Sequence, residues 1–129
     1  MSKPGRNAAI AILVVIGVIT ASPVITALNP TGITSLYNVT FEDDAILLLV
    51  RHRQVMLGVL GAALVYGAFL HHLRMMVITA AVVSKLAFIG LCITTPELTQ
   101  GIQRIIYFDA VSIVLLIIAG VIFWRNPSV

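Results

Sequence analysis

Charged residues are scarce in this chain. Only 10% of its 129 residues are Asp, Glu, Lys or Arg, and 60% are apolar, whereas soluble domains carry about 25% charged residues. A soluble domain of this size exposes much of its surface, and eight basic and five acidic side chains are too few to cover it. The same composition excludes intrinsic disorder, which needs low hydrophobicity and high charge. The sequence therefore predicts an integral membrane protein.

Common motifs of catalysis, metal binding and nucleotide binding are also missing. The single cysteine, Cys92, cannot form an intrachain disulfide. The sequence has no CxxC, CxxCH or HExxH pattern, and its nine glycines form no GxGxxG or Walker loop. The basic residues are scattered, and in a membrane protein a basic excess usually reports orientation. We expect no metal, no cofactor and no nucleic-acid partner, and the sequence offers no catalytic residue.

Four apolar stretches are long enough to cross a bilayer, whose core of roughly 30 Å needs about 20 helical residues. We predict an all-α integral membrane bundle of four transmembrane helices, forming one domain over residues 1–129. The expected helices cover residues 8–28, 43–71, 75–94 and 105–124. Pro23 should kink the first helix. That helix also resembles a signal peptide, but its apolar run of about 21 residues is long for one, so we expect it to be retained.

The longest connection, 29–44, is expected on the outer side of the membrane. Residues 29–32 have the composition of a turn. Three larger side chains then follow at the spacing i, i+3, i+4: Ile33, Leu36 and Tyr37. This spacing predicts a short interfacial helix in the first outer loop. Thr40 followed by Asp43 resembles a capping box that would start the second long helix.

The charges that flank the expected helices predict their orientation, because cytoplasmic loops are enriched in Lys and Arg. One side carries Lys3, Arg6, His71, His72, Arg74 and Arg125. The other side carries Glu42, Asp43, Asp44, Glu97 and Arg104. Clear loop cations number four against one, or four against three if Arg51 and Arg53 lie in the outer loop. We expect a multi-pass inner-membrane protein with both termini in the cytoplasm.

Three ionisable residues, Arg51, Lys85 and Asp109, are expected at or within the apolar layer. Each costs roughly 2.5–3.5 kcal/mol on insertion scales, so it normally faces a partner or a cavity. Helical angles at 100° per residue place Arg51 and Gln54 on the inward side of the second helix. Arg53 points elsewhere, so we expect it to extend toward the outer interface.

Shared helix faces define the remaining candidates. A stripe of mostly small residues on the second helix predicts close helix packing: Gln54, Gly58, Gly61, Val65, Ala68 and His72. On the fourth helix, Asp109 and Ser112 share a face with Leu116, Gly120 and Phe123. Lys85 should lean toward the cytoplasm and away from Asp109, because helical side chains tilt toward the N-terminus.

These candidates allow three interpretations. The set Arg51, Gln54, Lys85, Asp109 and Ser112 could form a structural ion pair, a pocket for an anionic or polar head group, or a proton relay. His52, Arg53, His71 and His72 are expected at the membrane interfaces. Haem would need two facing histidines at one depth, which these positions do not provide within one chain.

Two segments, 47–58 (LLLVRHRQVMLG) and 82–88 (VVSKLAF), resemble a group of small four-helix bacterial inner-membrane proteins. The group shares Arg-His-Arg at the start of its second helix and a serine in its third. Its members are often labelled phosphopantetheine adenylyltransferase, a soluble α/β enzyme with a His-x-Gly-His loop that this sequence lacks. The resemblance implies a fold without chemistry, and it makes Arg51, His52 and Arg53 the first residues to test.

Two functions are compatible with the sequence. Small size, short loops and small-residue faces favour a non-catalytic accessory or oligomeric subunit of a membrane complex, whose partners are lipids, other subunits or further copies. The alternative is a transporter-like or enzymatic bundle that binds a lipid or small anion in a polar pocket in the outer half of the membrane. A direct contact between Asp109 and Arg51 would favour the first function, and a head-group pocket would favour the second.

Overall fold

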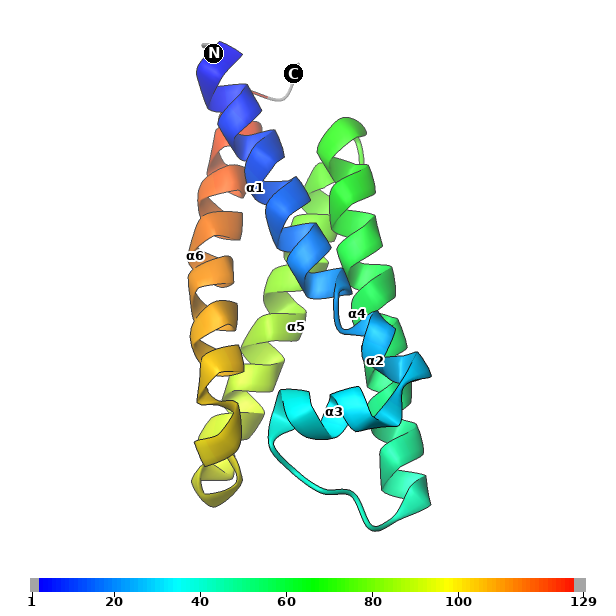
Figure 1. The fold of residues 1–129 in the computed structure, drawn as a ribbon. Coiled ribbons are helices and arrows are strands. Elements are labelled where there is room, and N and C mark those ends of the chain that lie inside the picture. The colour runs from blue at the N-terminus through cyan, green and yellow to red at the C-terminus, as the bar shows by residue number, and fades with distance from the viewer. Residues whose placement is uncertain (1–2, 127–129) are drawn as a thin grey trace.

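The computed structural model describes residues 3–126, and this part of the chain is helical with no strand (Figure 1). Its elements are α1 (Lys3–Ala21), α2 (Val24–Leu28), α3 (Pro30–Tyr37), α4 (Asp44–Phe69), α5 (Arg74–Thr94), the short 3-10 helices η1 (Pro96–Leu98) and η2 (Gln100–Ile102), and α6 (Gln103–Arg125). Four segments are long and apolar enough to cross a membrane. The predicted all-α class and the predicted number of apolar spans are therefore confirmed.

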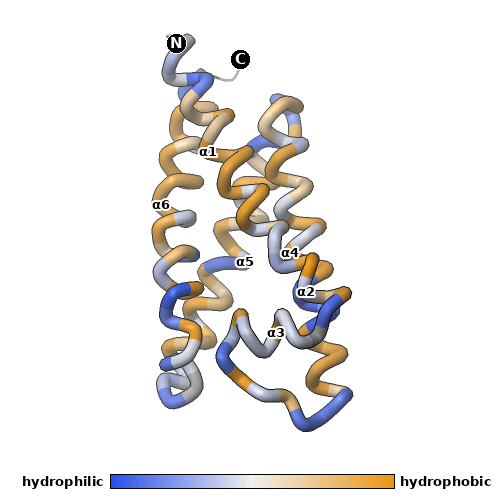
Figure 2. The backbone as a smooth tube through the Cα atoms, in the orientation of Figure 1, coloured by the Kyte–Doolittle hydropathy of each residue, from blue (hydrophilic) through white to orange (hydrophobic). Residues whose placement is uncertain are grey.

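The two ends of the bundle differ in what they contain. Both termini and the α4–α5 turn lie at one end, which we call the terminal end (Figure 1). Helix α3 and the connection from α5 to α6 lie at the opposite end, which we call the far end. Apolar residues cover most of the long helices, while hydrophilic residues collect mainly toward the ends (Figure 2). Many large apolar side chains point outward, such as Leu28 at 87% exposure and Trp124 at 74%.

The first span is interrupted at Pro23, as the sequence predicts. Helix α1 ends at Ala21 and α2 begins at Val24, because proline has no backbone N–H to donate and its ring obstructs the preceding turn. The Ser22 hydroxyl donates to the carbonyl of Ile19 at 2.8 Å beside the break. The break lets α2 leave the axis of α1 and pack along α4.

The small-residue stripe of α4 packs against α1 and α2 of the same chain. A Cβ atom on Gly61 would lie only 2.4 Å from the carbonyl oxygen of Gly17, and one on Gly17 would lie 2.8 Å from that of Gly61. A Cβ atom on Gly58 would lie 2.9 Å from a side-chain methyl group of Val24. These glycines allow two helix backbones to touch, which is the packing role that small residues commonly have in membranes.

The segment between α2 and α4 forms a helix and a loop. The predicted short helix is present as α3 and ends at Asn38, whose φ of 54° is left-handed. Helix α4 is capped by Asp43, whose side chain accepts from the backbone N–H of Ala45 at 2.8 Å. The prediction of a cap at Thr40 is therefore wrong, because the helix begins at Asp44 and the Asp43 carboxylate accepts a free N–H of its first turn.

Candidate functional site

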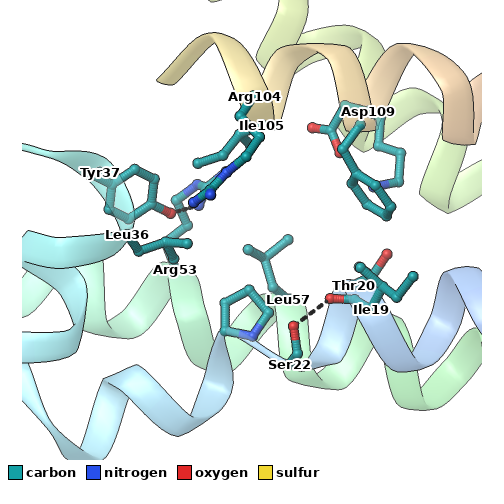
Figure 3. Close-up of a pocket in the computed structure, with 13 residues that line it drawn as sticks. Ile19, Thr20, Ser22, Leu36, Tyr37, Arg53, Leu57, Arg104, Ile105 and Asp109 are labelled. Atoms are coloured by element: carbon teal, nitrogen blue, oxygen red, sulfur yellow. Dashed lines mark hydrogen bonds and ion pairs between the residues drawn. The ribbon is translucent and has the colours of Figure 1, made fainter. Parts of the chain in front are cut away.

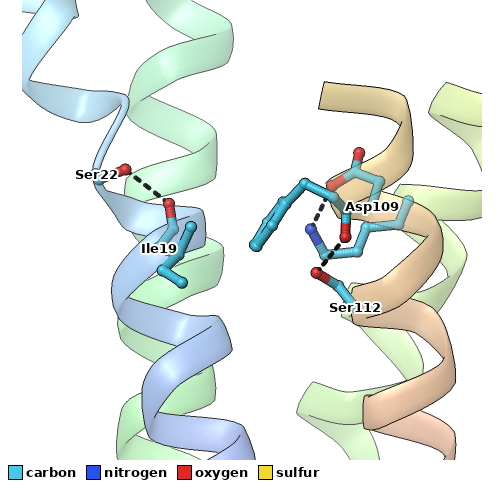
Figure 4. Close-up of polar contacts among 6 residues, drawn as sticks. Ile19, Ser22, Asp109 and Ser112 are labelled. Carbon is cyan, nitrogen blue, oxygen red and sulfur yellow. Dashed lines mark hydrogen bonds and ion pairs between the residues drawn. The ribbon is translucent and has the colours of Figure 1, made fainter. Parts of the chain in front are cut away.

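A buried ion pair joins α5 to α6. The ammonium of Lys85 donates to Oδ1 of Asp109 at 2.7 Å (Figure 4), and the two residues are only 5% and 7% exposed. The ring centroid of Phe108 lies 5.2 Å from the same ammonium. The expectation that Lys85 leans away from Asp109 is wrong. The Cα–Cβ bond of a helical lysine tilts toward the N-terminus, but the flexible four-carbon chain beyond it can bend back toward Asp109. The ion pair forms because an unpaired charge in this layer would be costly.

Arg51 does not join this pair. Its Nε donates to the carbonyl oxygen of Ala27 at 2.7 Å. Ala27 belongs to the last turn of α2, where carbonyl groups have no partner within the helix. The break at Pro23 brings this helix end beside α4, and Arg51 supplies the missing donor. The expected grouping of Arg51 with Asp109 is therefore wrong.

Arg53 is half-buried in the far half of the bundle, between Tyr37 of α3 and Phe88 of α5. Its Nη1 donates to the Tyr37 hydroxyl, and its guanidinium lies 5.0 Å from the ring centroid of Phe88. The Tyr37 hydroxyl in turn donates to Oε1 of Gln54 at 3.4 Å. Gln54 is fully buried, as predicted, and its Nε2 has no hydrogen-bond partner among the described residues. Arg53 extends toward α3 at the far end of the bundle, and its expected course toward the outer interface stays a prediction.

A cavity of about 280 Å³ lies at the far half of the bundle (Figure 3). The α1–α2 break, α3, α4, α5 and α6 all contribute to its walls. Its main polar residues are Thr20, Tyr37, Arg53, Lys85, Arg104 and Asp109. The volume is close to the lower limit of small-molecule sites. The cavity therefore has room for a head group or for several waters.

The charges that line this cavity do not balance. Three cations face one carboxylate, and Lys85 already neutralises Asp109. The guanidinium groups of Arg53 and Arg104 therefore leave two positive charges in excess. Arg104 is exposed and has no hydrogen bond or ion pair among the described residues.

Thr20 also lines the cavity. Thr20 is 4% exposed, and its Oγ1 has no hydrogen-bond partner in the described part of the chain. Buried polar groups are normally hydrogen-bonded, because leaving one without a partner costs free energy. The cavity thus presents two guanidinium groups and an unused hydroxyl, a combination suited to a negatively charged group that accepts hydrogen bonds.

The remaining predicted residues lie away from the cavity. Ser112 is fully buried, as its helix face predicts, and its hydroxyl donates to the carbonyl of Phe108 at 2.7 Å within α6. His52 is exposed on α4. His71 and His72 are exposed in the turn at the terminal end, with ring centroids 5.6 Å apart.

Thr20 shares a face of the first helix with Gly17, and this face predicts its place in a polar pocket. Sequence reasoning did not place Tyr37 or Arg104 in the site. Tyr37 and Arg104 lie in or beside connections whose path helical angles cannot predict.

Comparison with protein-family models, with curated proteins and with solved structures finds no match for this chain. The likeness to a four-helix group therefore stays a resemblance carried by residues 47–58 and 82–88.

Proposed function

We propose that this chain is a multi-pass membrane protein that binds the anionic group of a ligand in its far-half cavity. One observation carries the proposal: Arg53 and Arg104 line the same cavity, while its carboxylate, Asp109, is already paired with Lys85. The cavity is thus electropositive, and its guanidinium groups have N–H donors that make no hydrogen bond within the described residues. The Thr20 hydroxyl, buried without a partner, adds a further hydrogen-bonding group.

Arginine suits this role because its planar guanidinium offers paired N–H donors that match the oxygens of phosphates and carboxylates. A network built only for stability would use such donors within the protein. Arg53 binds the Tyr37 hydroxyl through one nitrogen. Arg104 has no polar contact with the described residues. Both side chains therefore keep donors available for a ligand.

Charge distribution supports an orientation for this site. Arg6, Arg74 and Arg125 lie at the terminal end, and acidic residues such as Glu42 and Glu97 lie in the far-end loops. The positive-inside rule then puts both termini in the cytoplasm and the cavity in the outer half of the membrane. Helix α3 would lie along the outer interface, with Ile33 fully buried beneath it. The resemblance to bacterial proteins favours the inner membrane.

One observation that favoured the competing role, an oligomeric or accessory subunit, no longer supports it. The small-residue stripe of α4 is occupied by α1 and α2 of the same chain. It is therefore not a free face for a partner helix. The geometry favours ligand binding over assembly as the primary role.

Glycerol 3-phosphate is a suitable probe, because it carries a phosphate and no acyl chain. We expect detergent-solubilised protein to bind it with a Kd of about 1 mM, equivalent to about 4 kcal/mol. Arg104→Gln should weaken binding at least tenfold, because hydrogen bonds to charged groups contribute about 1.5–3 kcal/mol. Isothermal titration calorimetry measures both values.

Arg125→Gln is the matched control. Arg125 lies on the same helix and is also exposed, but it lies at the terminal end. It should bind glycerol 3-phosphate like the wild type. Equal affinity in all three proteins, or no binding to the wild type, would overturn the proposal.

A further inference from the structure

A second hollow lies beside the cavity, between α4 and α5. The two helices touch near the terminal end, where a Cβ on Gly67 would lie 2.5 Å from a methyl group of Val77, and they diverge toward the far end (Figure 1). The divergence leaves a groove of about 390 Å³. Its apolar walls are Met56, Leu57, Leu60, Ala87, Phe88 and Leu91.

The groove and the cavity meet at Arg53 and Leu57, which line both. The guanidinium of Arg53 lies 5.0 Å from the ring centroid of Phe88 in the groove and 5.6 Å from that of Tyr37 in the cavity. Its bond to the Tyr37 hydroxyl holds it at this junction. A fixed positive charge therefore separates a polar, cationic compartment from an apolar one.

We propose that the ligand is an anionic phospholipid, with its head group in the cavity and an acyl chain in the groove. This inference rests on the proposed function and names the class of ligand. A phosphate ester without a compensating amine fits the two uncompensated guanidinium groups, whereas an ammonium head group would be repelled by them. A free inorganic anion would leave the adjoining groove without a role.

The direction of the groove matches that of a lipid chain. Its walls span residues 53–60 of α4 and 84–91 of α5, and seven residue steps correspond to about 10 Å along a helix. It runs from Arg53 toward the terminal end. In the orientation proposed above, this direction leads from the outer interface to the bilayer centre, as does the chain of a lipid in the outer leaflet.

A second copy of the chain fits the groove less well. Most of a helix face in this layer is apolar, so a helix packed over the groove would cover Arg53 without offering it an anion. Burying a cation without a counterion costs more free energy than apolar helix packing in a membrane contributes. The charge at the junction therefore favours a lipid as the occupant.

The test uses nanodiscs made of equal parts of phosphatidylglycerol and phosphatidylcholine. Native mass spectrometry of protein released from them reports which lipid remains bound. We expect the wild type to retain phosphatidylglycerol about tenfold over phosphatidylcholine, the ratio that 1.4 kcal/mol of differential affinity produces. Ala87→Phe fills the groove from an exposed position and should remove this preference. Glycerol 3-phosphate, which needs no groove, should still bind this variant.

Ala110→Phe is the matched control, because Ala110 is an exposed alanine on α6 that lines neither hollow. It should behave as the wild type in both assays. If Ala87→Phe keeps the lipid preference while glycerol 3-phosphate binds, the groove assignment is overturned and the proposed function stands. If glycerol 3-phosphate does not bind the wild type, both fail. If the wild type instead forms a dimer without bound lipid, and Ala87→Phe dissociates this dimer, the groove is a protein interface and the inference is overturned.

Discussion

The ion pair between Lys85 and Asp109 permits a quantitative prediction, because both partners can be replaced by apolar residues. Lys85→Met leaves the Asp109 carboxylate without its partner, and Asp109→Leu leaves the ammonium without its own. Removing one partner of a buried pair costs about 3–5 kcal/mol, whereas replacing both is often neutral or stabilising. The pair lies 2.7 Å apart but borders a cavity of about 280 Å³ that can admit water. We therefore expect each single variant to lose about 3 kcal/mol, the lower part of that range.

The double variant Lys85→Met/Asp109→Leu should lie within about 1 kcal/mol of the wild type, so the magnitude of the coupling free energy should be about 5 kcal/mol or more. Unfolding of the detergent-solubilised protein by SDS, followed by the fluorescence of the single tryptophan, Trp124, gives the four free energies of unfolding. Arg125→Met, a similar change at an exposed site, should change stability by less than about 0.5 kcal/mol. Single variants that each lose less than about 1 kcal/mol and add without coupling would refute the buried pair.

Two further stability predictions follow from the packing. Gly61→Ala should destabilise the fold by about 1–3 kcal/mol, because its Cβ would lie 2.4 Å from the Gly17 carbonyl oxygen. The control Gly90→Ala, whose Cβ would have no atom within 4 Å, should be neutral or slightly stabilising. Equal effects of the two substitutions in the same SDS assay would contradict the close contact. Asp43→Ala should cost about 1 kcal/mol by removing the cap of α4, with Asp44→Ala as the exposed neighbour for comparison; no loss of stability would show that the cap contributes nothing.

Local physics explains which parts of the fold were predictable. The apolar lengths predict the four spans, because a bilayer dictates how long a crossing helix must be. Pro23 predicts the break in the first span, because proline disturbs a helix wherever it lies in the interior. The burial of Asp109, Ser112 and Leu116 follows from their shared face on one helix. Each of these features depends on residues that are close in the sequence.

The site was less predictable because it depends on how separate elements pack. A helical angle gives the direction of a side chain but not the element that lies there. Arg51 contacts the end of α2 and Arg53 contacts α3, and both contacts depend on the path that the chain takes between Pro23 and Tyr37. Lys85 reaches Asp109 through a flexible stem that a fixed side-chain direction does not describe. The mean tilt of helical side chains therefore gave the wrong direction for Lys85, and helical angles did not reveal the partners of Arg51 and Arg53.

The central claim is that Arg53 and Arg104 hold the anionic group of a ligand. Titration of glycerol 3-phosphate into protein labelled with ¹⁵N at arginine Nε tests it most directly, because each guanidinium reports separately by NMR. We expect the Nε–H signals of Arg53 and Arg104 to shift together with one Kd, while the signal of Arg51, which is bound to the Ala27 carbonyl, stays unchanged. Shifts confined to the arginines of the terminal end, or no saturable shift at all, would contradict it.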